Sequence, residues 1–160
     1  MCQAWPTRFD GPWTNNVPTR SERSLIYLDT SALVKVVIEE AESGALREWM
    51  ATRPDRVSSL LTAVEMRRAA RRAPSDRSRG RAADLGRETE VVLSGLQLLS
   101  LDEEIARRAA ILDPPNLRSL DAIHIATALS LADLGDFVTY DTRLAAAART
   151  AGLQVQSPGT

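Results

Sequence analysis

Four acidic residues that lie far apart in the chain each stand where an apolar stretch meets an expected helix start or turn. They are Asp29, Glu65, Asp121 and Asp141. Asp29 closes the apolar run 25–28 and Asp141 closes the run 137–140, so both are expected at the carboxyl ends of buried strands. In parallel α/β sheets, ligands bind at that edge. The placement therefore predicts one composite acidic site.

Such a cluster of carboxylates needs compensating positive charge. Two carboxylates about 5 Å apart repel each other by about 3 kcal/mol at an effective dielectric constant near 20. Protonation of some of them relieves this repulsion, and so does the binding of two divalent cations. A set of oxygen ligands favours Mg²⁺ or Mn²⁺ over Zn²⁺. Together, the carboxylates predict two-metal hydrolysis of a phosphodiester, in which one cation lowers the pKa of a bound water and the other stabilises the leaving oxygen.

Each acidic residue, taken alone, also has a purely structural explanation. Asp29, Asp121 and Asp141 could each cap a helix, and Glu65 fits a capping box that starts at Thr62. Independent caps explain less economically why all four residues recur at one predicted edge of the sheet. A shared site is therefore the favoured interpretation.

The neighbours of these residues add hydroxyl and imidazole groups. Thr30 and Ser31 follow Asp29 at an expected helix N-terminus, a geometry that suits a metal ion and a phosphate together. His124 lies one helical turn after Asp121 and could reach the site as a ligand or proton carrier. A lone histidine on an apolar helix is more often a core or boundary residue, so both readings of His124 stay open.

A basic segment follows the second expected strand. Residues 58–87 contain eight arginines against three acidic residues, although the net charge of the whole chain is −1. Guanidinium groups suit bidentate contact with phosphate. A solvated helix face is an equally good explanation. The candidates for this phosphate contact are Arg67, Arg68, Arg71 and Arg72.

Length and composition limit the class of protein. A chain of 160 residues, 44% hydrophobic and 26% charged, fits one globular domain of ordinary size. No apolar run is long enough to span a membrane, and the N-terminus lacks the pattern of a signal peptide, so a cytoplasmic protein is expected. A single cysteine excludes an internal disulfide and a cysteine-rich metal site.

Short apolar runs alternate with helical patterns from Leu25 onward, which indicates βαβ units and a parallel sheet of four to five strands. Strands are expected at 25–28, 57–60, 96–101, 137–140 and 153–156. The expected helices follow residue 30 and cover 42–51, 62–72, 76–92, 102–112, 119–131 and 144–151. Residues 1–24 are rich in proline and lack apolar periodicity, so they are expected to be a disordered extension or the product of a mis-assigned translation start.

Four segments, taken in order, resemble a PIN-domain ribonuclease of the VapC toxin type. They are Ile26-Tyr27-Leu28-Asp29-Thr30-Ser31-Ala32, Ser58-Ser59-Leu60 leading to Glu65, Leu120-Asp121-Ala122-Ile123-His124-Ile125-Ala126-Thr127-Ala128, and Val138-Thr139-Tyr140-Asp141-Thr142-Arg143-Leu144. The resemblance covers residues 25–158, and the combination of segments is far more specific than any one of them. Residues 1–24 stand outside the family pattern.

This resemblance implies an α/β/α sandwich, Mg²⁺-dependent endonucleolytic cleavage of RNA, a homodimer, and inhibition by a cognate VapB antitoxin. It assigns the acidic quartet of the family to Asp29, Glu65, Asp121 and Asp141, with Asp29 and Asp121 as the main metal ligands and Thr30 or Ser31 in support. The choice of RNA over DNA also comes from the resemblance.

Two alternatives remain from other functional classes. A non-catalytic module that binds RNA or a partner protein would keep its RNA affinity after chelation and after loss of Asp29. A small-molecule phosphohydrolase or response-regulator-like pocket is the other. It is weakened because Lys35, the only lysine, lies in the first helix and not near the later strands, where it could accompany an acceptor aspartate.

Overall fold

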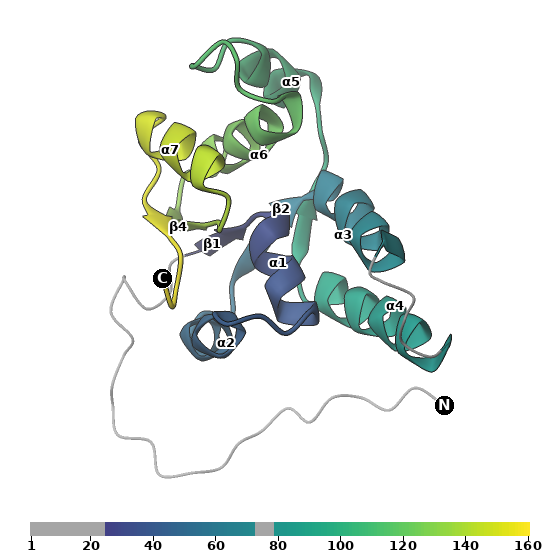
Figure 1. The fold of residues 1–160 in the computed structure, drawn as a ribbon. Helices are drawn as coiled ribbons and strands as arrows, with labels where there is room; N and C mark the ends of the chain where they lie inside the picture. The colour runs from purple at the N-terminus through teal and green to yellow at the C-terminus, as the bar shows by residue number, and fades with distance from the viewer. Residues whose placement is uncertain (1–24, 73–78) are drawn as a thin grey trace.

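A computed structural model describes residues 25–72 and 79–160 (Figure 1). The expectation for residues 1–24 and the predicted helix start at 76–78 lie outside the described residues. The elements, in chain order, are β1 (Leu25–Leu28), α1 (Thr30–Val37), α2 (Ser43–Ala51), β2 (Arg56–Ser59), α3 (Leu60–Arg72), α4 (Arg79–Ser94), β3 (Gln97–Leu99), α5 (Glu103–Ala110), α6 (Ser119–Leu129), β4 (Leu134–Val138), α7 (Thr142–Thr150) and β5 (Val155–Gln156).

The five strands form one parallel sheet in the order β3-β2-β1-β4-β5, which confirms the predicted fold class. β1 lies at the centre, between β2 and β4. Every strand runs in the same direction, so the carboxyl ends of β1, β2 and β4 share one edge. The chain turns into α1, α3 and α7 just beyond that edge.

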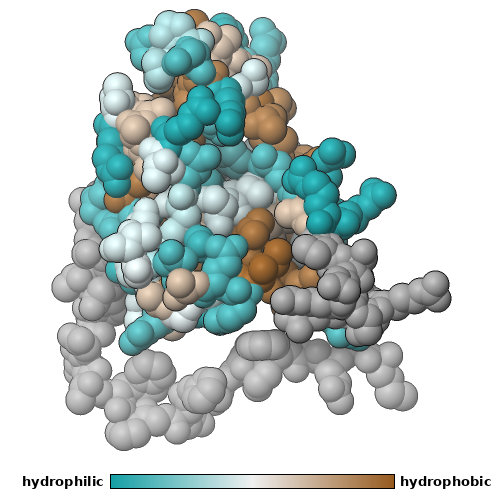
Figure 2. All heavy atoms as spheres, in the orientation of Figure 1, coloured by the Kyte–Doolittle hydropathy of each residue, from teal (hydrophilic) through white to brown (hydrophobic). Residues whose placement is uncertain are grey.

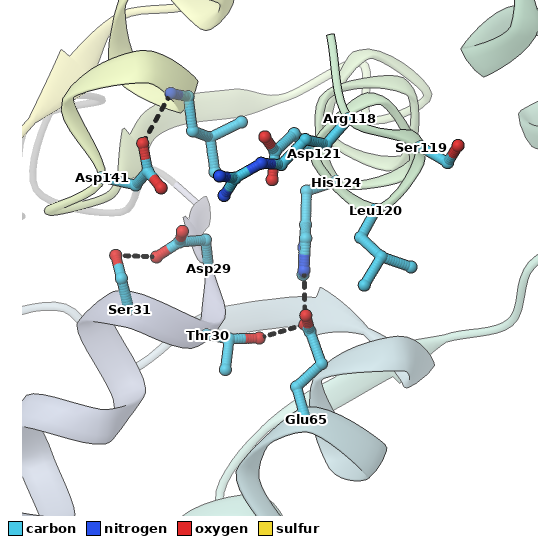
Figure 3. Close-up of a pocket in the computed structure, with 11 residues that line it drawn as sticks. Asp29, Thr30, Ser31, Glu65, Arg118, Ser119, Leu120, Asp121, His124 and Asp141 are labelled. Carbon is cyan, nitrogen blue, oxygen red and sulfur yellow. Dashed lines mark hydrogen bonds and ion pairs between the residues drawn. The ribbon is translucent and has the colours of Figure 1, made fainter. Parts of the chain in front are cut away.

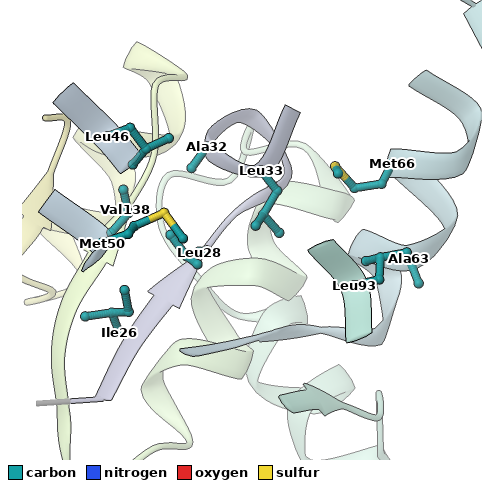
Figure 4. Close-up of a cluster of buried hydrophobic side chains, with 10 residues drawn as sticks. All are labelled: Ile26, Leu28, Ala32, Leu33, Leu46, Met50, Ala63, Met66, Leu93 and Val138. Atoms are coloured by element: carbon teal, nitrogen blue, oxygen red, sulfur yellow. The ribbon is translucent and has the colours of Figure 1, made fainter. Parts of the chain in front are cut away.

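Successive side chains of each central strand point to opposite faces of the sheet, so both faces are apolar. Helices cover both faces and form two cores. Ile26 and Leu28 of β1 pack with residues of α1 to α4 in one cluster (Figure 4). Tyr27 points the other way and packs with Phe137 of β4 and with residues of α6 and α7. β1 is therefore apolar throughout, as a central parallel strand requires.

Several boundaries differ from those that the sequence predicts. α3 begins at Leu60, directly after β2, so Thr62 lies inside the helix and its hydroxyl is hydrogen-bonded to Ser58 Oγ at 2.7 Å. β4 ends at Val138, before the predicted end at Tyr140. The chain leaves the strand there because Tyr140 donates its backbone N–H to Ser31 Oγ at 2.8 Å.

Among the described residues, no helix is both long enough and apolar enough to cross a membrane.

Candidate active site

The four predicted acidic residues come together at the predicted edge of the sheet. They line one cavity of about 310 Å³, together with Thr30, Ser31, Arg118, Ser119, Leu120, His124 and Leu144 (Figure 3). Asp29 follows β1, Glu65 lies on α3, Asp121 lies in the first turn of α6, and Asp141 precedes α7. Four elements that are distant in sequence thus each contribute one carboxylate.

Asp29 is the most deeply buried of the four, with 3% of its surface exposed. Its Oδ1 caps α1 by accepting the Ala32 N–H at 3.0 Å, and it also accepts the Ser31 hydroxyl at 2.7 Å. Its Oδ2 accepts the Thr139 hydroxyl at 3.0 Å. Asp29 is therefore a helix cap that also lines the cavity, and the cap fixes its carboxylate at the cavity wall.

Glu65 lies in the second turn of α3, since the helix begins earlier than predicted. Its Oε2 accepts hydrogen bonds from the Thr30 hydroxyl and from His124 Nε2, the latter at 3.0 Å. Within the described chain, its partners are therefore those two side chains across the cavity. Glu65 therefore links α3 to α1 and α6, in place of the capping box with Thr62 that the sequence also allowed.

Asp121 and Asp141 occupy the opposite side of the cavity. Asp141 caps α7 by accepting the N–H groups of Arg143 and Leu144 at 2.8 and 3.0 Å. Asp121 Oδ2 is buried and has no hydrogen-bond partner among the residues that the structure describes. A buried carboxylate oxygen without a donor is costly unless a ligand satisfies it.

Two polar residues of the site carry no clear sequence signal. Thr139 holds Asp29 and also accepts the Asp141 N–H at 3.1 Å, so it links two of the acids. Arg118 is the residue before α6, and its side chain reaches into the cavity beside Asp121 (Figure 3). The sequence signal for Thr139 is its position two residues before the predicted acid Asp141.

The surroundings shift the pKa values of these acids in opposite directions. Burial raises the pKa of Asp29 above its ordinary value. Burial and the negative charge of Asp141 raise the pKa of Asp121. Burial also acts upward on Glu65, but the hydrogen bonds from His124 and Thr30 outweigh it and hold the pKa of Glu65 below its ordinary value. Glu65 is thus stabilised as a carboxylate, whereas Asp29 and Asp121 bear the electrostatic cost of the site.

Replacing Asp121 by Asn should therefore stabilise the metal-free protein. The raised pKa means that folding disfavours the charged form, so stability is lost as pH rises from the unfolded pKa to the higher folded pKa. At pH near 7 we expect D121N to melt a few degrees above the intact protein. Thermal melts in EDTA at neutral pH and at pH about 3 test this. At the lower pH, Asp121 is largely protonated in both the folded and the unfolded protein, so the gain should vanish there.

Asp133→Asn is the matched control, because Asp133 is exposed in the turn that follows α6. Its melting temperature should match that of the intact chain at both pH values. A D121N protein that melts at or below the temperature of the intact protein at neutral pH would show that Asp121 carries no electrostatic strain.

The donor set fits an oxygen-preferring divalent cation. The acidic ligands are all carboxylates, and Asp121 Oδ2 is a buried oxygen without a hydrogen-bond donor in the described chain. Across residues 25–72 and 79–160, no three His, Cys, Asp or Glu side chains are already arranged around one ion position. Asp29, Glu65 and Asp141 are each held by hydrogen bonds of their own, which keep the like charges at different walls of the cavity.

Comparison with known proteins is consistent with this geometry. The family model of the PIN domain matches residues 26–150. Ribonuclease VapC46 of Mycobacterium tuberculosis is 45% identical over 135 residues, which cover 83% of this chain and 97% of that protein. The acidic residues of the cavity all fall within the matched range 26–150.

Solved structures share the fold. A toxin-antitoxin complex from Klebsiella pneumoniae has a TM-score of 0.56 and 25% identity, covering 75% of this chain and 88% of that one. FitAcB from Neisseria gonorrhoeae has a TM-score of 0.68 and 21% identity, covering 84% and 98% of the two chains. At that identity, the second likeness concerns the fold alone.

Proposed function

This chain belongs to the PIN-domain family, among the VapC ribonucleases, and from that membership we propose that it is the toxin of a toxin-antitoxin pair and acts as a metal-dependent endoribonuclease. The observation that carries the proposal is the single cavity lined by Asp29, Glu65, Asp121 and Asp141. Family membership indicates RNA as the substrate, and the carboxylates of the cavity indicate metal-dependent hydrolysis.

The side chains of the cavity have distinct roles in this proposal. Asp29 and Asp121 are the principal ligands of the cation, and Glu65 and Asp141 complete its oxygen environment. Ser31 and Thr139 hold Asp29 in place, and Thr30 does the same for Glu65. Arg118, exposed at the rim, is positioned to contact a substrate phosphate.

Mg²⁺ is the proposed cation, and Mn²⁺ is expected to replace it because both prefer oxygen ligands. When bound, the metal supplies an activated water and stabilises the charge that develops on the leaving oxygen. The protein holds the carboxylates of Asp29, Glu65 and Asp141 through caps and side-chain hydrogen bonds, which limits their motion when substrate arrives.

Purified protein, free of antitoxin, should cut total cellular RNA into discrete fragments with Mg²⁺, and EDTA should leave the RNA intact. A parallel reaction with single-stranded DNA of mixed sequence tests the choice of substrate, and we expect no cleavage of it. If folded protein binds RNA equally well with and without EDTA and cuts nothing, it is a non-catalytic module. Cleavage of DNA at the same rate as RNA would overturn the assignment of substrate.

A larger groove adjoins the cavity and provides a path for the RNA backbone. It has a volume of about 900 Å³ and is lined by Arg68 and Arg72 of α3 and Lys35 of α1. Apolar residues also line it, and Figure 2 shows hydrophobic surface over α1 within a largely hydrophilic face. Arg72 is close enough to lower the pKa of Glu65 through its charge, so the basic side of the groove continues into the acidic site.

Neutralising Arg68 and Arg72 together, as R68Q/R72Q, should weaken RNA binding and flatten its salt dependence. Each lost phosphate contact on a single strand lowers the slope of log K against log salt by about 0.7, so the double variant should lose about 1.4. Fluorescence anisotropy with labelled RNA, measured over a salt series in EDTA, gives the slope without cleavage. An unchanged slope would show that these arginines form a solvated helix face and do not contact phosphate.

Arg67→Gln is the control for that experiment. Arg67 lies on the same helix, but its guanidinium makes two hydrogen bonds of 2.8 Å to Glu90 of α4. Both side chains are exposed, so the pair contributes little to stability. We therefore expect R67Q to keep the salt slope of the intact protein. Arg71 is exposed on α3 and remains a predicted RNA contact.

The proposed partners are a cognate VapB-type antitoxin and a second copy of this chain. Support for the antitoxin comes from the Klebsiella structure, whose name describes a toxin-antitoxin complex. Exposed apolar side chains suited to protein contacts include Leu60 and Val64 of α3 and Leu120 of α6. Light scattering of the isolated chain and of the chain expressed with its antitoxin tests both partners.

A further inference from the structure

A chain of buried hydrogen bonds runs from the centre of the sheet to the acidic cavity. Tyr27 OH lies 2.8 Å from His124 Nδ1, and His124 Nε2 lies 3.0 Å from Glu65 Oε2. Tyr27 is fully buried, and His124 is 2% exposed. Three elements, β1, α6 and α3, are thus joined through two ring side chains (Figure 3 shows the end of the chain at Glu65).

The direction of these hydrogen bonds follows from their partners. The Tyr27 oxygen accepts the backbone N–H of Ser59 at 3.1 Å. The Tyr27 hydroxyl lies against His124 Nδ1 and can donate its proton there. His124 Nδ1 is then the acceptor, and Nε2 carries the hydrogen that is donated to Glu65.

The two hydrogen bonds to Glu65 both use the same oxygen. Oε2 accepts from His124 and from Thr30, whereas Oε1 has no hydrogen bond among the described residues. A carboxylate fixed through one oxygen presents its other oxygen in a defined orientation. Outer hydrogen bonds of this kind orient metal-binding carboxylates in proteins.

We propose that Tyr27 and His124 are positioning residues that hold Glu65 for the cation of the acidic cavity. The inference rests on the proposed function, since Glu65 is a ligand only if the cavity binds a metal. His124 acts through Glu65 and contacts no substrate. Tyr27 acts one step further away by fixing which nitrogen of His124 carries the hydrogen.

Aromatic packing holds the ring of Tyr27 in place for this role. Tyr27 stacks on Phe137 of β4 with ring centroids 5.1 Å apart and an angle of 7° between the planes. Tyr27→Phe removes one oxygen and leaves this packing in place, so it is the mildest test of the chain. H124L removes the donor to Glu65, whereas H124Q keeps an N–H that can reach it.

Mn²⁺ binding, measured by calorimetry in the absence of RNA, tests the inference apart from activity. We expect Y27F and H124L to bind Mn²⁺ about 10- to 100-fold more weakly than the intact protein, and H124Q to recover part of that loss. Thr89→Val is the control, because it removes a buried hydroxyl that is bonded within α4 to Leu85 at 2.7 Å. T89V should bind Mn²⁺ as the intact protein does.

A double-mutant cycle shows whether the effect passes through Glu65. In an E65Q background, Y27F and H124L should weaken Mn²⁺ binding no further. Equal losses with and without Glu65 would overturn the inference, as would intact Mn²⁺ affinity in both single variants. If those variants bind normally while the intact protein cuts RNA, the positioning role fails and the proposed function stands. An intact protein that neither binds Mn²⁺ nor cuts RNA would refute both.

Discussion

Replacing Asp29 by Asn should lower the rate of RNA cleavage by at least about 10³-fold while the protein stays folded. The charge of Asp29 is the most buried in the cavity, and an amide cannot replace it in balancing a divalent cation. Loss of about 4 kcal/mol of charge stabilisation in the transition state corresponds to that factor. Single-turnover rates with Mg²⁺ in excess measure it directly, and far-UV circular dichroism checks the fold.

Asp102→Asn is the control for the helix-capping part of this change. Asp102 caps α5 by accepting the N–H of the residue three positions on, at 2.8 Å, as Asp29 does for α1 at 3.0 Å. An asparagine can make either cap, so D102N controls for the loss of a capping charge. The sites differ because Asp29 is buried at the cavity and bonded to Ser31 and Thr139, whereas Asp102 is exposed. D102N should cleave at the normal rate. Comparable activity in D29N would mean that Asp29 only caps its helix.

Removing the metal should be as damaging as removing a ligand. Dialysis against EDTA is expected to lower cleavage by at least about 10³-fold, because the proposed role of the cation is to activate the attacking water. The same treatment should lower Tm, since a cation that binds only the folded state stabilises it by mass action. Rates and melts of one preparation, before and after chelation, give both numbers.

Restoring Mg²⁺ or Mn²⁺ to the chelated protein should return both the rate and the melting temperature. D121N provides the comparison, because it lacks a principal ligand and should show little thermal response to either ion. A chelated protein that retains full activity, with no metal detected by elemental analysis, would exclude the metal-dependent mechanism.

The sequence was sufficient to locate the acidic site because its signals are local. Asp29 follows an apolar run that becomes the central strand, and Asp121 and Asp141 stand at helix starts. Parallel strand order then brings these positions to one edge without further information. The strand and helix types were predicted for the same reason, since hydrophobic periodicity survives errors of a few residues at the boundaries.

What the sequence could not predict depends on contacts between distant positions. Tyr27 and His124 are 97 positions apart, and their hydrogen bond requires the register that seats α6 against β1. The sequence does not decide between a core environment and a cavity environment for His124, and the structure places it in both. Glu65 bonds to Thr30 and not to Thr62, because α3 begins two residues before the predicted start. Arg118 enters the cavity from a loop whose path has no periodic signal.

Three reactions on total cellular RNA should be compared: intact protein with Mg²⁺, intact protein with EDTA, and D29N with Mg²⁺. We expect discrete fragments only with the intact protein and Mg²⁺, with ends that can be mapped to a target sequence. Fragments of the same pattern from D29N, or from the EDTA reaction, would contradict this expectation, because the acidic cavity would then not be the site of the chemistry.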